Sequence, residues 1–163
     1  MLTKAQKFVL DELECARLDL PFTLLGIHSD SGSEFINDQL YRDCKGEQIK
    51  FTRGRAGKKN DNARVEQKNW SVVRRLAGYG RYETQQQVEQ LNAVYAEARL
   101  YINFFKPVMK LKAKQRVGSQ VKKIHDEPKT PYQRLMDCET LDATAKKKLK
   151  ATSDSLRLSK LKA

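Results

Sequence analysis

The sequence has 163 residues, of which 39% are apolar and 32% charged, and its formal net charge is +12. These values predict a soluble protein with one domain and a modest core, with or without a small appendage. They exclude a membrane-spanning protein, because no apolar stretch approaches the roughly 20 residues that a transmembrane helix needs. The first 15 residues mix charged and apolar side chains, so we expect no signal peptide and a cytoplasmic, nucleoid-associated location.

The first two elements are predicted to be a helix and a strand. Residues 3–18 place apolar side chains near a 3.6-residue period, which predicts an amphipathic helix, and Pro21 prevents that helix from continuing. The apolar run 22–27 predicts a buried strand. Asp30 follows this strand, at the end where open α/β sheets usually place ligand-binding groups.

A second helix and a second strand follow. Ser31 and Glu34 have the spacing of a capping box, which predicts a helix to about residue 45 that Gly46 ends. Residues 48–52 alternate apolar and polar side chains, as in a strand with one buried face.

A basic loop then leads into a helix predicted over residues 61–77. Asn60 suits the N-cap and Asp61 the positive end of the helix dipole. Helical spacing places Glu66 at the border of the buried face, where it is expected to reach the end of the Asp30 strand. Trp70 and Tyr79 are expected to be packing residues more often than base-stacking platforms.

The C-terminal part is predicted to be helical and basic. Thr84 and Gln87 form a second capping box, for a helix to residue 105 whose apolar stripe either packs on the domain or forms a self-association seam. Residues 106–123 contain seven basic and no acidic residues and form either a strand pair with a turn near Gly118 or an extended arm. Thr130, Pro131 and Gln133 predict a short helix at 131–136. The residues after it are expected to be poorly ordered without a partner.

The positive charge is concentrated in two segments. Residues 1–52 hold 6 basic and 9 acidic side chains, residues 53–75 hold 8 and 2, and residues 106–163 hold 16 and 6. Such clustering is typical of a protein that binds a polyphosphate, although charge alone does not distinguish DNA from RNA. The cations predicted to contact DNA are Arg53, Arg55, Lys58, Lys59, Arg64, Lys68, Arg74 and Arg75.

Two carboxylates stand in a recognisable pattern. Asp30 lies within Ser29-Asp30-x-Gly32-x-Glu34-Phe35, and Glu66 lies within Asn60-Asp61-Asn62-Ala63-x-Val65-Glu66-Gln67-x-Asn69. Thirty-five residues separate Asp30 from Glu66. The strings and their spacing closely resemble the integrase and transposase superfamily, whose signature is Asp, Asp, a 35-residue spacer and Glu, and within it the bacterial insertion-sequence transposases. Asp30 matches the second Asp and Glu66 the Glu, whereas the first Asp has no match.

The resemblance implies a fold and a chemistry. The fold is α/β, a helix-rich, partial ribonuclease H-like integrase core at residues 1–105 that lacks its first three strands, followed by a basic C-terminal module or tail at 106–163. Asp30 and Glu66 would be catalytic residues and would each bind one Mg²⁺ or Mn²⁺ ion of a two-metal site for DNA strand transfer, which is expected to be inactive without the first Asp. The implied partners are DNA and a full-length transposase or a second copy of this chain.

Other interpretations stay open. Asp30 is otherwise an ordinary turn residue and Glu66 a solvated helix carboxylate. A second hypothesis is a non-catalytic nucleic-acid-binding protein that inhibits full-length transposase, and a third is a basic RNA-associated protein of the ribosomal kind.

Overall fold

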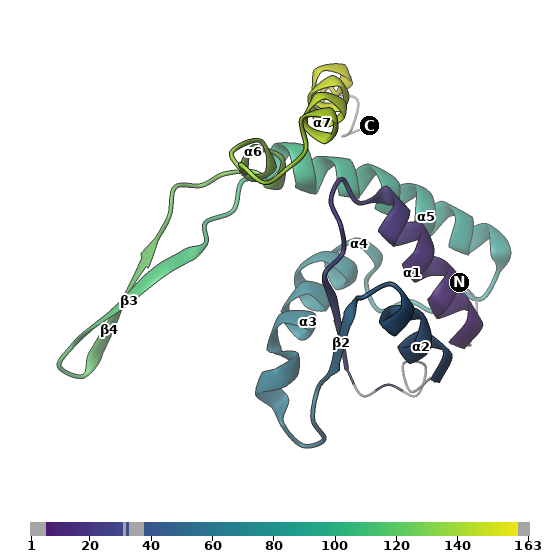
Figure 1. Cartoon of the computed structure of the whole chain (residues 1–163), viewed down its shortest axis with the longest axis horizontal. Coiled ribbons are helices and arrows are strands. Elements are labelled where there is room, and N and C mark those ends of the chain that lie inside the picture. The colour runs from purple at the N-terminus through teal and green to yellow at the C-terminus, as the bar shows by residue number, and fades with distance from the viewer. Residues whose placement is uncertain (1–5, 31, 33–37, 160–163) are drawn as a thin grey trace. The chain divides into compact units, whose positions relative to one another are not determined.

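The computed structural model describes residues 6–30, 32 and 38–159, and shows a mixed α/β, helix-rich chain (Figure 1). It divides into two compact units, Met1–Asn92 and Ala93–Ala163, so that the division falls within one long helix. The predicted boundary after residue 105 remains a prediction. None of the helices in the described ranges combines the length and the apolar character that a bilayer crossing requires.

The first unit is built around a parallel strand pair. Helix α1 (Gln6–Asp19) precedes strand β1 (Gly26–Ser29), helix α2 (Asp38–Gly46) and strand β2 (Lys50–Arg53). The strands pair in parallel from Gly26 opposite Lys50 to Ser29 opposite Arg53, which requires the crossover that α2 supplies. Figure 1 shows α2 beside β2. The unit therefore contains a complete β1–α2–β2 motif.

The bounds of β1 correct the predicted strand 22–27. Pairing with β2 begins only at Gly26, and the apolar side chain of Leu25 remains largely exposed. An apolar run raises the tendency to form a strand, but a strand exists only where a partner backbone accepts and donates hydrogen bonds. The predicted capping box of Ser31 and Glu34 lies outside the described residues.

The end of α2 confirms the prediction that Gly46 ends this helix. The helix includes Gly46, and the chain reverses at Gln48, whose φ is 56°. The backbone N–H of Gln48 donates to the Lys45 carbonyl at 3.3 Å, and that of Ile49 donates to the Cys44 carbonyl at 2.7 Å. These bonds satisfy carbonyls at the helix end and direct the chain into β2.

Residues 59–77 form a continuous helical segment of changing type. A 3-10 turn (Lys59–Asn62) leads into α3 (Ala63–Lys68), a π-helical stretch (Asn69–Arg74) and α4 (Arg75–Ala77). The predicted N-cap at Asn60 is wrong, because Asn60 already lies within the 3-10 turn and no side chain caps this start. The helix prediction itself is confirmed.

Helix α5 (Gln85–Leu100) continues as a π-helical turn (Tyr101–Phe105). Its start confirms the predicted capping box. Gln87 N–H donates to Thr84 Oγ1 at 3.2 Å, and Gln87 Oε1 accepts from the Thr84 N–H at 3.2 Å. Among the described residues, the buried apolar side chains are few: Val9, Leu40, Cys44 and Val88.

The second unit carries an antiparallel strand pair. Strands β3 (Leu111–Val117) and β4 (Gln120–His125) meet at a turn in which Gly118 has a φ of 61°. This resolves the alternatives for residues 106–123 in favour of the strand pair. Figure 1 shows the pair as a long, narrow hairpin that extends away from α6 (Pro131–Met136). Helix α6 has the predicted capping box of Thr130 and Gln133, with Pro131 in its first turn.

The prediction of poor order after residue 136 is wrong for much of that segment. Residues Ala143–Ser155 form helix α7, which Asp142 caps through its carboxylate, accepting from the N–H groups of Thr144 at 2.9 Å and Ala145 at 3.2 Å. The cap satisfies two of the four N–H groups that a helix start leaves unpaired.

Candidate functional site

Asp30 lies directly after β1 and is exposed. Its Oδ1 accepts a hydrogen bond from the Gly32 N–H at 3.0 Å, and its carbonyl accepts from Ser29 Oγ at 3.0 Å. The carboxylate thus closes a turn with the backbone two residues later, a common arrangement for aspartate after a strand. One oxygen of Asp30 is used in this way, and the side chain remains accessible to solvent.

The end of β1 is tied to the loop and helix that follow β2. The Gly54 N–H donates to the Ser29 carbonyl at 2.9 Å. His28 Nδ1 lies 2.9 Å from Thr52 Oγ1, and His28 Nε2 lies 3.2 Å from the carbonyl oxygen of Asp61. His28 therefore has a structural role, and it holds the start of the Glu66-bearing helix against the strand that precedes Asp30.

The loop after β2 is closed by Arg55 and Asp61. Arg55 donates to the Asp61 carboxylate from its backbone N, Nε and Nη2 at 3.1, 2.8 and 3.0 Å. These bonds, with a smaller contribution from His28, lower the pKa of Asp61 to about 2. We refer to the contacts of His28, Thr52, Arg55 and Asp61 as the loop latch. The latch was not predicted, because no helix or strand period relates residues six apart in a loop.

Beside the latch, the Asn62 side chain lies close to Gly54. A Cβ atom at this position would lie 2.2 Å from Asn62 Oδ1, so a larger residue would displace the Asn62 side chain. Gly54 therefore leaves room for the Asn62 side chain at the point where the loop leaves β2.

Glu66 is exposed, which corrects its predicted place at the border of a buried face. Helix α3, the π-helical stretch and α4 contain no buried residue. The apolar stripe of this segment is solvent-accessible too, and its exposed members are Val65, Trp70, Val73 and Leu76. The helix does carry Glu66 on the element that the latch fixes to β1, but none of the described residues of the first unit covers it.

The described residues do not make up a metal centre by themselves. No group of three or more histidine, cysteine, aspartate or glutamate side chains gathers anywhere in the described ranges. Carboxylate oxygens suit Mg²⁺ or Mn²⁺, but a two-metal site needs more ligands than the two that Asp30 and Glu66 would provide. The chain thus supplies part of such a donor set at most.

The predicted DNA-contacting cations have different surroundings. Arg55 belongs to the loop latch. Arg53 pairs with Ser29 in the last position of the strand pair, and Arg64 and Lys68 are exposed on α3. Lys58 is exposed beside the latch, whereas the side chain of Lys59 lies outside the described residues. Apart from Arg74 and Arg75, the cations of this set whose side chains are described therefore lie at the end of β2, on the loop after it and on α3.

Arg74 and Arg75 lie over aromatic rings. The Arg75 guanidinium carbon is 4.7 Å from the centroid of the Trp70 ring, and that of Arg74 is 4.7 Å from the centroid of the Tyr79 ring. Trp70 is 56% exposed and Tyr79 78% exposed, so the expectation that both are packing residues is wrong. The helix presents two cation–π pairs to solvent.

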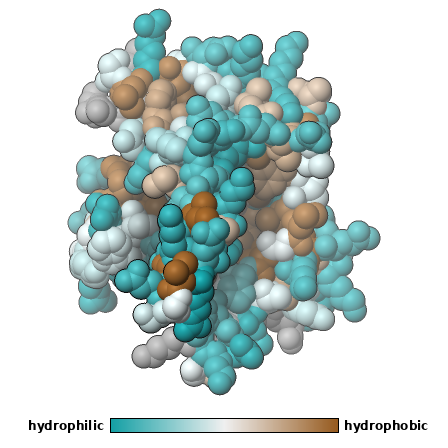
Figure 2. All heavy atoms as spheres, turned by 90° about the vertical axis from the view of Figure 1, so that its left-hand side faces the viewer, coloured by the Kyte–Doolittle hydropathy of each residue, from teal (hydrophilic) through white to brown (hydrophobic). Residues whose placement is uncertain are grey.

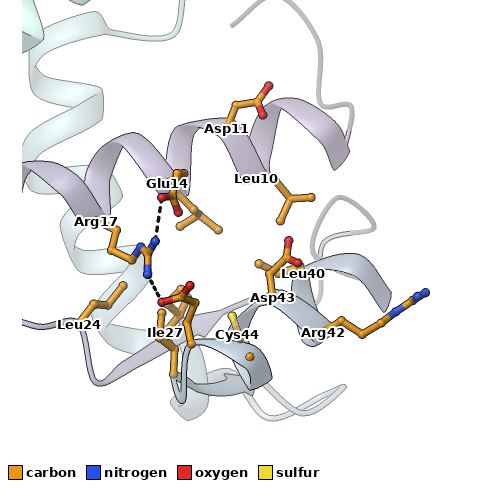
Figure 3. Close-up of a pocket in the computed structure, with 14 residues that line it drawn as sticks. Leu10, Asp11, Glu14, Arg17, Leu24, Ile27, Leu40, Arg42, Asp43 and Cys44 are labelled. Atoms are coloured by element: carbon orange, nitrogen blue, oxygen red, sulfur yellow. Dashed lines mark hydrogen bonds and ion pairs between the residues drawn. The ribbon is translucent and has the colours of Figure 1, made fainter.

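A pocket of about 780 Å³ in the first unit lies apart from this site (Figure 3). Arg17 lies at its edge and forms ion pairs with Glu14, at 2.8 Å, and with Glu47. Leu10, Leu40 and other apolar side chains form much of the remaining wall. Neither Asp30 nor Glu66 lines this pocket.

Comparison with known proteins adds one relative. The chain is 40% identical over 132 residues to the uncharacterized protein y4rM of Sinorhizobium fredii (strain NBRC 101917 / NGR234). The matched residues make up 81% of this chain and 38% of the relative, so this sequence corresponds to well under half of the relative's length. No family model matches the chain.

Proposed function

We propose that this chain is part of the catalytic core of an integrase-type transposase, with a partial ribonuclease H-like fold, and that it binds DNA. The observation that carries the proposal is the parallel β1–α2–β2 motif, with Asp30 directly after β1 and Glu66 on the helix that the loop latch ties to that strand end. Strand ends of this kind are where α/β proteins place their reacting groups.

The proposed parent reaction is metal-dependent strand transfer, in which a 3′ hydroxyl attacks a DNA phosphodiester. Asp30 and Glu66 would contribute oxygen ligands to Mg²⁺ or Mn²⁺ ions, whose chemistry is to neutralise the attacking and leaving oxygens. The remaining carboxylate has no match in these 163 residues. We therefore propose DNA binding for this chain alone and strand transfer only for an assembly that contains the missing Asp.

Phosphate binding is proposed for the exposed cations of the first unit. Arg64 and Lys68 carry no acidic partner among the contacts that the structure describes, and they lie four residues apart on one face of α3, whereas Glu66 projects from another face. Cations placed in this way hold DNA by its backbone and position it without reading its sequence.

Fluorescence anisotropy with a labelled 30-base-pair duplex tests the proposal. The chain should bind with a steep salt dependence that EDTA does not alter. Arg64→Gln with Lys68→Gln should weaken binding by about tenfold at moderate salt, whereas Glu66→Gln should change it by less than about twofold. Absence of binding to duplex DNA at low salt would overturn the proposal.

The catalytic part is tested in a longer protein that contains this sequence and the first Asp. Glu66→Gln should abolish strand transfer there while DNA binding persists, because the carboxylate would bind metal and not DNA. Transfer that continues in the Glu66→Gln variant would show that Glu66 is not a metal ligand.

A second candidate function is inhibition of a full-length transposase by joining it. The exposed apolar stripe of residues 63–77 favours this alternative, since such stripes usually contact another protein surface. Light scattering after size exclusion would compare the chain alone with a mixture of the chain and a longer protein that contains this sequence and the first Asp. A complex that Val65→Ser with Leu76→Ser prevents would support the inhibitor, and two separate species would exclude it.

A further inference from the structure

The hairpin of β3 and β4 is exposed on both of its faces. Every residue of β3 is exposed, and in β4 only Ile124 is partly covered. A two-stranded hairpin without a covered face is marginally stable in water, and most sheets bury at least one face. Within the described part of the second unit, no element covers either face of the β3–β4 hairpin.

The charge of the hairpin has a single sign. Five cations project from the two strands, and no acidic residue occurs between Lys106 and His125. Lys114 lies directly opposite Lys123, and Gln115 opposite Lys122, so cations occupy both faces. Like charges at opposed positions destabilise a strand pair, and an anionic partner between them would remove that repulsion.

The base of the hairpin is fixed to the rest of the second unit. Arg134 of α6 donates to the Asp126 carboxylate at 2.6 and 3.2 Å and to the Val108 carbonyl at 2.7 Å. Asp126 also accepts from the Lys110 N–H at 2.6 Å, and Val108 pairs with Lys129. The Arg134 side chain and the Lys110 N–H together lower the pKa of Asp126 to about 2. Several hydrogen bonds therefore hold the base of the β3–β4 hairpin to the rest of the second unit. We refer to this hairpin as the arm.

Two exposed valines lie near the turn of the arm, on opposite faces of the hairpin. Val117 is 72% exposed and Val121 52% exposed, on either side of the turn at Gly118. Figure 2 views the molecule from the side of the hairpin and shows mainly hydrophilic residues, with isolated apolar ones between them. The chain lacks Phe, Tyr and Trp from residue 106 to residue 131, which argues against a single-stranded ligand that would stack its bases on aromatic rings.

We propose that the β3–β4 hairpin is a DNA-binding arm that enters the major groove of duplex DNA. The major groove, about 12 Å wide, admits a two-stranded ribbon, whereas the deep, narrow major groove of duplex RNA does not. Seven residues of β3 extend over about 23 Å, which corresponds to roughly two thirds of a helical turn of DNA. Lys114, Lys123 and Arg116 lie on one face of the ribbon and contact phosphates along the groove, and Val117, on the other face, contacts its floor.

The inference deepens the proposed DNA binding and rests on it, so the experiment must separate the two. Anisotropy of the full chain with the 30-base-pair duplex would be measured between 50 and 300 mM NaCl. Lys114→Gln with Lys123→Gln should lower the slope of log K against log salt by about 2 and weaken binding about tenfold at 150 mM. The matched control is Lys147→Gln with Lys148→Gln on α7, two exposed cations with the same change of charge, for which less than threefold is expected.

The folding of the variants is checked independently. Removing two opposed like charges should leave the thermal midpoint unchanged or raise it, so weaker binding by the hairpin variant would not reflect unfolding. Netropsin, which fills the minor groove, should leave the difference between the hairpin and control variants unchanged.

Several outcomes would overturn the inference. If both lysine pairs weaken binding equally, the effect is one of net charge and the hairpin has no special role. If only Arg64→Gln with Lys68→Gln weakens binding, the chain binds DNA as proposed but the hairpin takes no part in the binding. If duplex RNA or vesicles containing phosphatidylglycerol compete better than duplex DNA, the arm serves another ligand. If the wild-type chain binds no DNA, both proposals fail.

Discussion

The two strand pairs are stabilised in different ways. Each has only two strands, which by themselves make a weak sheet. The parallel pair β1–β2 is fastened along its length, by α2, by the Ser29–Gly54 bond and by the loop latch. Among the described contacts, the antiparallel pair β3–β4 is fastened at its base, by Arg134 and Asp126, and extends from there. One pair is built to position residues at its end and the other to present residues along its length.

The largest expected effect concerns the fastening of the parallel pair. Leu40 of α2 is 2% exposed, and Leu40→Ala should lower the free energy of unfolding of the first unit by about 3 kcal/mol through loss of burial and cavity formation. Urea unfolding followed by fluorescence of Trp70, the chain's one tryptophan, would report on this unit.

The control for Leu40→Ala is Leu18→Ala, at a side chain that is 74% exposed. It should change the free energy of unfolding by no more than about 0.5 kcal/mol. Equal losses in the two variants would mean that α2 does not hold the parallel pair.

The next effect concerns the base of the antiparallel pair. Arg134→Met removes the donors to Asp126 and Val108, so amide protons of Val108 and Lys129 should exchange at least about tenfold faster, while those of β1 and β2 are unaffected. Hydrogen exchange followed by NMR measures both sets in one sample. Lys129→Gln, which breaks only the exposed pair with Asp137, is the control, and faster exchange there by the same factor would contradict a special role for Arg134.

A pH titration tests both regions, because beside each strand pair there is one carboxyl whose pKa is strongly lowered. The pKa values of Asp61 and Asp126 are lowered from 3.8 to about 2, so the folded state binds fewer protons than the unfolded chain in this range. The stabilisation is complete above about pH 4 and is lost as the pH falls to about 2. NMR should show the latch and the hairpin base opening together over this interval.

Two variants assign that acid transition. Asp61→Asn should remove it from the loop after β2 only, and Asp126→Asn from the hairpin base only. If neither variant alters the profile, the ion pairs with Arg55 and Arg134 do not stabilise these regions.

The smallest effect is expected at Glu66. Because no side chain of α3 is buried, Glu66→Gln should change the free energy of unfolding by no more than about 0.5 kcal/mol. Thermal unfolding of the variant beside the wild type measures this difference. A large loss of stability would show that Glu66 has a structural partner and would weaken its assignment to metal binding.

Local signals in the sequence predicted much of the secondary structure. The capping boxes of Thr84 and Thr130 and the turn at Gly118 each depend on a few adjacent residues, and the structure confirms them. The bounds of β1 could not be predicted, because they depend on where β2 offers a partner. Aspartate is a favourable N-cap residue, so Asp142 could have indicated the start of α7. The lysine-rich composition of this segment led instead to the expectation of poor order.

The candidate site was less predictable, because its contacts are tertiary. Spacing and local strings identified Asp30 and Glu66, but the contact of His28 with Asp61 depends on a loop that no periodicity describes. The exposure of Glu66 and Trp70 follows from the absence of covering elements in the described part of the first unit, which a helical pattern does not reveal. The assignment of metal-binding roles still rests on the resemblance.

The π-helical stretch at Asn69–Arg74 carries a consequence for the evolution of this surface. A π turn usually accommodates one residue more than the α-helix around it, and one residue of an α-helix turns the chain by about 100°. Deletion of a single codon within this stretch would restore regular α-helical bonding and would leave Arg64 and Arg75 facing nearly as before, because the π turn already accommodates the extra residue. The helix can therefore gain or lose one residue here without changing how the cations on either side of the stretch face.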